Sequence, residues 1–173
     1  VKALADIGGS RGGLLLLADE QYLFSRSVAW NWDGPLPGGG EGAEALARFV
    51  EGQAFVLDFD NLRSGWLSHG EQRIPVPLWL TAIGAWAGVP LVHAGRLLGM
   101  VILAHPPYRR PLDWEDYDLF RAAGIQAASY LAEARSQQAL ADSQRFDEFN
   151  RRFAFILHDI KNLVSQLSLV TRN

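Results

Sequence analysis

Residues 89–104, VPLVHAGRLLGMVILA, decide the fold of this chain. Two apolar runs flank a turn at Ala94-Gly95, and glycine can adopt the positive φ that a tight turn between strands requires. The pattern predicts an antiparallel β-hairpin that is buried on at least one face.

Shorter patterns upstream of this hairpin predict the rest of the sheet. Residues 13–18 form a buried apolar run, and 21–30 are predicted to pair with it across Asp19-Glu20. The apolar spacing in 41–50 is helical, and 54–57 predict a further strand. Four to six strands with a few helices give an α+β fold, an antiparallel sheet flanked by helices. The remaining segments are expected to be loop over 35–40, loop and a short helix over 61–73, and of ambiguous type over 78–86.

Composition limits the class of protein. The 173 residues are 49% apolar and 20% charged, which indicates one globular domain with an extension. A net charge of −3 without a basic stripe argues against a nucleic-acid partner. The chain has no cysteine, which excludes disulfides, thiolate metal sites, cysteine nucleophiles and thioether-linked chromophores.

The chain carries no signs of membrane contact or secretion. No apolar run approaches the ~20 residues of a membrane helix, and the first residues do not resemble a signal peptide. The chain starts at Val1 and stops at Asn173 inside a helical pattern. We therefore expect a cytoplasmic piece of a longer protein, and leave open whether that parent is anchored in the inner membrane.

The residues from 113 onward predict one long helix. Asp113 is a good N-cap with Asp116 three residues on, and Gly124 is the only glycine in a stretch without proline. Apolar residues then follow alternating steps of three and four, which is a coiled-coil seam that should pair with a second copy or with a later helix. Upstream this repeat meets polar residues, so we expect a break or stutter near 134–145. The seam comprises Phe146, Phe149, Phe153, Ile156, Ile160, Leu163, Leu167 and Val170.

His158 is the candidate for chemistry on this helix. It lies about 200° around the helix from Ile156, and so on the face opposite the seam. Asp159 is adjacent, and Lys161 and Asn162 share the outer face. An exposed imidazole nitrogen can attack a phosphoryl group while a carboxylate accepts a hydrogen bond from the other nitrogen. In that reaction Asp159 is the acid/base partner and Lys161 offsets phosphate charge.

Other candidate sites are weaker. His69, His93 and His105 are scattered, and no pair has metal-ligand spacing. Residues 58–61, DFDN, lack the ligand spacing and glycine of a calcium loop and predict a turn. The glycine-rich stretches at 8–13 and 38–40 are not phosphate-binding loops but flexible turns. We expect no metal site, and expect the six tryptophans to fill core and edge positions: Trp30, Trp32, Trp66, Trp79, Trp86 and Trp114.

Residues 89–104 resemble the strand, glycine turn and strand of GAF domains, in which P-L-x-x-x-G-x-L-x-G-x-aliphatic recurs. The resemblance covers roughly the first 135 residues. It implies a regulatory domain with a GAF-like fold, and it leaves the ligand of that domain unknown.

Residues 155–163, FILHDIKNL, resemble the phospho-acceptor box of sensor histidine kinases. That box reads His, an acid, an apolar residue, a basic residue, then Thr or Asn, and usually Pro. Leu163 stands in the place of proline, so the helix need not kink. Residues 157–169 are also similar to the acceptor helix of exosortase-linked (PEP-CTERM, PrsK-like) sensor kinases.

The resemblance implies a GAF-like sensor domain at 1–134, a connecting signalling helix at 135–150, and the start of a dimerisation helix at 151–173. His158 is then the phospho-acceptor, and Asn162 orients water for the phosphatase reaction. ATP and Mg²⁺ would be bound by a domain outside these residues, so the fragment alone should be inactive. The implied partners are a second copy through the C-terminal helix and the receiver domain of a response regulator.

Two other classes of function stand beside this one. A non-enzymatic GAF module for dimerisation or small-molecule binding explains the first domain equally well, but leaves the string His158 to Asn162 unexplained. A free-standing GAF sulfoxide reductase needs cysteine, and the chain has none.

Overall fold

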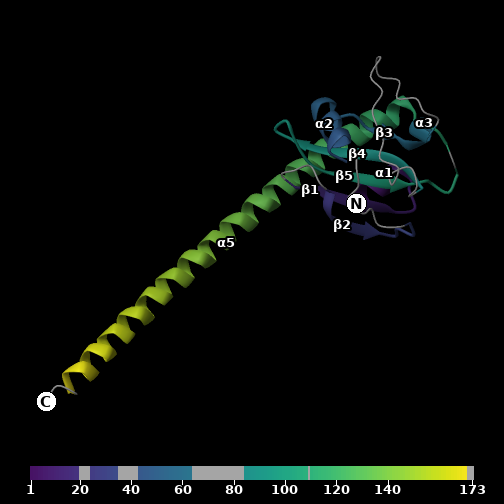
Figure 1. Ribbon diagram of the computed structural model, residues 1–173. Helices are drawn as coiled ribbons and strands as arrows, with labels where there is room; N and C mark the ends of the chain where they lie inside the picture. Colours follow the sequence, from purple (N-terminus) through teal and green to yellow (C-terminus); the bar gives the residue numbers. More distant parts are fainter. Residues whose placement is uncertain (20–23, 35–42, 64–83, 109, 171–173) are drawn as a thin grey trace. The chain divides into compact units, whose positions relative to one another are not determined.

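The computed structural model describes residues 1–19, 24–34, 43–63, 84–108 and 110–170. Contacts divide the chain into two compact units, Val1–Ala132 and Glu133–Asn173. The described elements are α1 (Lys2–Gly8), β1 (Gly13–Ala18), β2 (Phe24–Trp30), α2 (Ala43–Gln53), β3 (Leu57–Asp58), α3 (Phe59–Arg63), β4 (Ala85–His93), β5 (Arg96–Ala104) and α5 (Trp114–Val170) (Figure 1). The further division of the tail at residue 150 stays a prediction.

The five described strands form one antiparallel sheet in the order β2-β1-β5-β4-β3. β4 and β5 form the predicted hairpin, with His93 opposite Arg96. Both turn residues have positive φ, 48° at Ala94 and 75° at Gly95, which matches the right-handed twist of the two strands. β1 pairs with both β5 and β2, so the predicted pairing of the first two strands is confirmed.

Helices cover both faces of this sheet. Alternate residues of β5 point to opposite sides, because side chains along a strand alternate. Met100 and Ile102 join a cluster with Leu46 and Val50 of α2, whereas Val101 and Leu103 join a second cluster with Leu4 of α1 and Phe120 of α5. The sheet is therefore the middle layer of the first unit, and the predicted α+β class is confirmed.

Helix α5 begins with a reciprocal cap. The Asp113 carboxylate accepts a hydrogen bond from the Asp116 backbone N–H at 3.0 Å, and the Asp116 carboxylate accepts one from the Asp113 N–H at 3.0 Å. These bonds satisfy backbone donors that the first helical turn leaves without partners. The N-cap predicted at Asp113 is confirmed.

The sequence patterns missed helix α1. Leu4 and Ala5 are buried against the sheet, and the Lys2 ammonium lies 2.8 Å from the Asp6 carboxylate. Gly9 ends the helix with φ 65°. The neighbouring Gly12 allows close chain contact, since a Cβ there would lie 1.9 Å from the Asn31 carbonyl oxygen. The glycine-rich stretch is thus a helix end and a packing contact rather than a flexible turn.

The strand predicted at 54–57 is wrong in its bounds, because β3 holds only Leu57 and Asp58. Ala54 has φ 47°, and its N–H donates to the Val50 carbonyl at 2.8 Å, so it closes the end of α2 instead of extending the strand. Several other predictions lie outside the described residues, namely those on 20–23, 35–42 and 64–83, which include His69, Trp66 and Trp79.

The break predicted near 134–145 is also wrong. Helix α5 continues through this stretch, which contains neither glycine nor proline to interrupt its hydrogen bonds. The stutter, the other alternative expected there, is a change in the apolar repeat that leaves the backbone helical, and it stays a prediction. None of the described helices combines the length and apolar character needed to cross a membrane.

A substitution at Gly124 tests how closely α5 packs on β4. A Cβ at this position would lie 2.8 Å from the Pro90 carbonyl oxygen and 2.9 Å from Val89 Cγ1. We expect Gly124→Ala to lower the free energy of unfolding by about 1–3 kcal/mol, because overpacking outweighs the gain in helix propensity. Urea denaturation measures the change.

Gly52 in α2 is the matched control, since a Cβ there meets nothing within 4 Å. Gly52→Ala should leave stability unchanged or raise it by up to ~1 kcal/mol. Equal effects of the two substitutions would show that the approach of α5 to β4 is not the cause.

Candidate functional site

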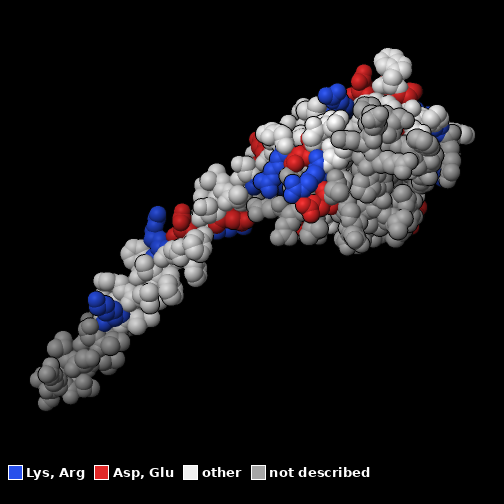
Figure 2. Space-filling view, turned by 45° about the horizontal axis from the view of Figure 1, so that its top comes forward, with Lys and Arg blue, Asp and Glu red and all other residues white. Residues whose placement is uncertain are grey.

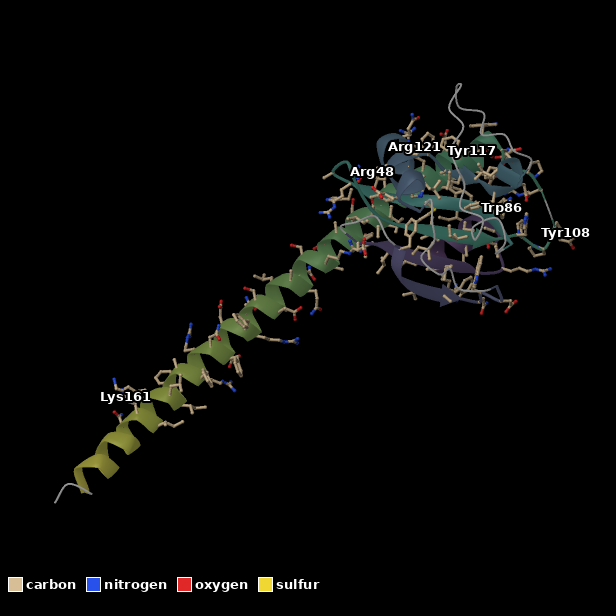
Figure 3. All side chains as sticks on the ribbon, viewed as in Figure 1. Arg48, Trp86, Tyr108, Tyr117, Arg121 and Lys161 are labelled. Atoms are coloured by element: carbon tan, nitrogen blue, oxygen red, sulfur yellow. The ribbon has the colours of Figure 1, made fainter. Side chains whose placement is uncertain are left out.

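His158 stands on an exposed part of α5 with two polar neighbours. Its side chain is 70% exposed. The Asn162 Nδ2 atom lies 3.2 Å from His158 Nδ1, and the Asp159 Oδ1 atom lies 3.7 Å from the same nitrogen. One helical turn therefore brings three of the four predicted site residues together around a single ring nitrogen. Lys161, the fourth, is exposed on the same stretch of helix (Figure 3).

This arrangement follows from helix geometry. Residues four apart lie one above the other on a helix, which places Asn162 over His158. The Asp159 carboxylate reaches toward the ring from the next position along the chain. An imidazole so placed is open to solvent and has both an amide and a carboxylate to hold its Nδ1 atom. Assignment of these residues to a phosphotransfer site stays a prediction.

The predicted seam is exposed in the second unit. Its described members, Phe146, Phe149, Phe153, Ile156 and Ile160, are each at least half exposed. The Phe149 and Phe153 rings stack with centroids 6.0 Å apart. Leu163, Leu167 and Val170 belong to the helix, but their side chains lie outside the described residues.

Two further apolar side chains of this unit were missed by the sequence patterns. Phe155 is 68% exposed and Leu157 is 51% exposed, and neither belongs to the seam. Phe155 is three residues before His158 and so lies beside it on the helix. The sequence did contain a signal for Phe155, because it is an aromatic residue that falls outside the alternating three- and four-residue steps of the seam.

Charges of both signs lie along the surface of α5 (Figure 2). Arg145 Nη1 is 3.5 Å from Asp142 Oδ1, and Arg152 pairs with Glu148 one turn away. Such exposed pairs add a few tenths of a kcal/mol each to helix stability. They account for the polar character of the helix and point to no anion site.

In the first unit, Arg110 binds the start of α5. Its guanidinium donates two hydrogen bonds to the Asp116 carboxylate, one of them at 2.7 Å. The same guanidinium lies 5.4 Å from the ring centroid of the buried Trp86, whose indole N–H donates to the Arg110 carbonyl at 3.1 Å. The hydrogen bonds from Arg110 lower the pKa of Asp116, and that of Arg110 is raised by the same contact.

Asp58 forms a second polar cluster and caps helix α3. Its carboxylate accepts hydrogen bonds from the N–H groups of Asp60 and Asn61, at 3.0 and 3.1 Å, and from the Tyr117 hydroxyl at 3.4 Å. Burial and the charge of Asp58 raise the pKa of Tyr117 to about 12. The turn predicted for 58–61 is thus a capped helix start.

The remaining sequence candidates do not converge. His93 is exposed, with Nδ1 3.5 Å from the Ser129 hydroxyl, and the mostly buried His105 has Nε2 3.3 Å from Asp60 Oδ1. Trp86 is core, whereas Trp114 is 72% exposed. Among the described residues, no group of three His, Asp or Glu side chains could hold a metal ion.

Comparison with known proteins identifies the family of the first unit. The family model described as GAF domain matches residues 1–131. The crystal structure of residues 122 to 287 of a methyl-accepting chemotaxis protein matches with a TM-score of 0.52 and 18% identity, over 76% of this chain and 84% of that one. No curated protein matches the sequence.

Two cyanobacteriochrome structures are similar at the same level. The TePixJ GAF domain matches with a TM-score of 0.50 and 17% identity, over 77% of this chain and 84% of that one. The blue-light absorbing form of the Thermosynechococcus elongatus PixJ GAF domain gives a TM-score of 0.50 and 14% identity, over 80% and 86%. Identities this low show likeness of fold alone.

The Arg110–Asp116 pair predicts a pH dependence of stability. Because the folded state lowers the pKa of Asp116 from its ordinary 3.8, the stabilisation is present above that value and is lost as pH falls through the folded pKa. We expect Asp116→Asn to cost about 1–2 kcal/mol near pH ~7, from the cap and the charged hydrogen bonds. Urea denaturation should show this deficit shrinking below pH ~4.

Asp118→Asn is the control, because Asp118 is an exposed acid on the same helix. It should change stability by less than ~0.5 kcal/mol at each pH. A deficit of Asp116→Asn that stays constant down to pH ~2 would contradict the assigned role of the Arg110 pair.

Proposed function

This chain belongs to the GAF domain family, and we propose that it is the sensory and regulatory part of a two-component sensor histidine kinase. In this proposal the GAF domain modulates the ATP-dependent autophosphorylation of His158, and the phosphate then passes to the receiver domain of a response regulator. GAF domains are sensory modules seen in chemotaxis receptors and cyanobacteriochromes. The finer assignment depends on α5.

The observation that carries the proposal is the polar cluster around His158 Nδ1. Asn162 and Asp159 meet at that nitrogen at 3.2 and 3.7 Å, on a side chain that is 70% exposed. In a surface histidine without a function, water alone can satisfy the ring nitrogens, so neither neighbour is required. A phospho-acceptor needs an accessible ring and a carboxylate that stabilises the positive charge of the phosphorylated imidazole.

The proposed reaction is an in-line phosphoryl transfer. One ring nitrogen forms a bond to the γ-phosphorus of ATP, and the bond from that phosphorus to the oxygen of the leaving ADP breaks. Mg²⁺ and ATP are supplied by a domain outside these residues. The side chains of this chain present the imidazole, hold its second nitrogen through Asp159, and offset phosphate charge with Lys161. In the opposing phosphatase reaction, which is a hydrolysis, Asn162 orients the attacking water.

Signal transmission is proposed to be mechanical. Helix α5 begins in the GAF domain, where Asp113 and Asp116 cap it, and the same helix carries His158. A ligand or partner that binds the GAF domain differently in two states would shift the rotation or register of this helix. That shift would change how His158 is presented to the ATP-binding domain.

The phosphorylation test uses the whole chain with the ATP-binding domain of its parent and labelled ATP. Wild-type protein should gain acid-labile phosphate, and His158→Gln should gain none. Asp159→Asn should slow labelling by about 10²-fold, the usual contribution of a positioned acid or base. His93→Gln is the matched control, because His93 is an exposed histidine in the first unit, and it should label as wild type does.

Retained phosphate in His158→Gln would reject the kinase assignment. Circular dichroism establishes that the variants keep their helix. Wild-type protein that stays unlabelled with an active ATP-binding domain would favour the alternative, a non-enzymatic GAF module coupled to another output.

The dimer proposed through the C-terminal helix has its own test. Phe153 lies on the seam, whereas Phe155, two residues later, lies about 160° around the helix from it. Both are at least half exposed. Phe153→Asp should weaken dimerisation by at least about tenfold, because it places a charge in an apolar interface. Sedimentation velocity over a range of concentrations measures the change.

Phe155→Asp makes the same chemical change off the seam and should leave the dimer intact. If both variants dissociate equally, or if neither does, the seam is not the interface.

A further inference from the structure

We propose that Asn162 is a positioning residue that selects the tautomer of His158, in competition with Asp159 for the same ring nitrogen. The inference deepens the proposed function and rests on it for its consequence, because tautomer choice matters only if His158 accepts phosphate. Its basis is the geometry at Nδ1.

Both neighbours of the imidazole approach Nδ1. Asn162 Nδ2 lies 3.2 Å away, within hydrogen-bonding distance, and Asp159 Oδ1 lies 3.7 Å away, beyond it. In this arrangement the ring is hydrogen-bonded to the Asn162 amide, and the Asp159 carboxylate lies just outside hydrogen-bonding distance.

The two neighbours require opposite tautomers. A neutral imidazole carries one N–H and one lone pair. The Asn162 NH₂ group can only donate, so it needs a lone pair on Nδ1 and places the ring proton on Nε2. An ionised Asp159 can only accept, so it needs the proton on Nδ1 and leaves the lone pair on Nε2. The ring cannot satisfy both at once.

This difference decides which nitrogen can react. While Asn162 holds Nδ1, that lone pair is used in a hydrogen bond and Nε2 carries a proton, so neither nitrogen is ready to attack. When Asp159 replaces Asn162, the ring loses its Nε2 proton to water and gains one at Nδ1. The Nε2 lone pair then forms the N–P bond, the electron pair of the breaking P–O bond leaves with ADP, and the proton stays on Nδ1, hydrogen-bonded to the Asp159 carboxylate.

The preference set by Asn162 is small enough to be reversed. The His158 and Asp159 side chains are 70% and 78% exposed, so water competes for the same atoms. A net hydrogen bond in such a place changes an equilibrium about two- to fivefold. A modest change in the helix around His158 is therefore enough to exchange one partner for the other.

Nitrogen-15 NMR of the whole chain tests the proposal without ATP. The protein is labelled at histidine and studied well above the pH at which imidazole titrates, ~6.5, so that the ring is neutral. The chemical shifts of Nδ1 and Nε2 report the tautomer ratio. The chain has four histidines, and His158→Gln identifies the signal of interest.

The Nε2–H tautomer should dominate in wild-type protein. Asn162→Ala should lower its ratio to the Nδ1–H form about two- to fivefold, and Asn162→Asp, which turns a donor into an acceptor, should lower it further. Asn150→Asp is the matched control, because it adds the same charge at an exposed position two turns upstream, and it should leave the ratio unchanged. Asp159→Asn removes the charged acceptor that favours the Nδ1–H form, and it should raise the ratio.

A ratio that stays the same in both Asn162 variants, or that moves toward Nε2–H in Asn162→Ala, would overturn the proposal. A ratio that Asn150→Asp changes as much as Asn162→Asp does would overturn it as well. Because the readout needs no phosphate, the proposed kinase function can fail while this result stands, and the reverse also holds.

Discussion

The structure depends on the burial of one hairpin from both sides. β4 and β5 are central strands, and successive residues of β5, from Met100 to Leu103, are buried alternately on opposite faces. Each fully buried aliphatic side chain contributes about 1.5–3 kcal/mol only if another layer covers it. Helices must therefore lie on both faces, with α2 and α3 on one and α1 and the first turns of α5 on the other.

That requirement determines how α5 begins. Phe120 and Ala128 complete the apolar layer, and Gly124 lets the helix backbone approach Pro90 closely. The cap at Asp113 and the Arg110–Asp116 pair hold the first turn. The position of the first turns of this helix thus depends on apolar packing, on the lack of a side chain at Gly124 and on the Arg110–Asp116 ion pair. The first turns of α5 are therefore held to the GAF domain by several independent contacts.

Further along the same helix, the apolar seam and His158 lie on different faces. The seam around Phe153 offers a surface for a second helix, whereas His158 has the polar neighbours Asp159 and Asn162 at its Nδ1 atom. In the proposed function His158 has to be reached by other domains, so it cannot share the buried interface of a paired helix. Phe155, beside His158, places an exposed apolar side chain on that same face.

Local patterns in the sequence determined the hairpin, the cap at Asp113, the long helix and the position of His158 on it, because each depends on residues a few positions apart. Tertiary structure alone decided the rest. Helix α1 is stabilised because Leu4 and Ala5 are buried against the sheet. The hydrogen bond from Tyr117 to Asp58 joins residues far apart in the chain. The meeting of Asn162 and Asp159 at Nδ1 is local but depends on side-chain rotamers, since spacing shows which residues are neighbours but not which atom they meet. Burial and hydrogen bonding between distant segments depend on where the chain returns in space, and no short window of sequence contains that information.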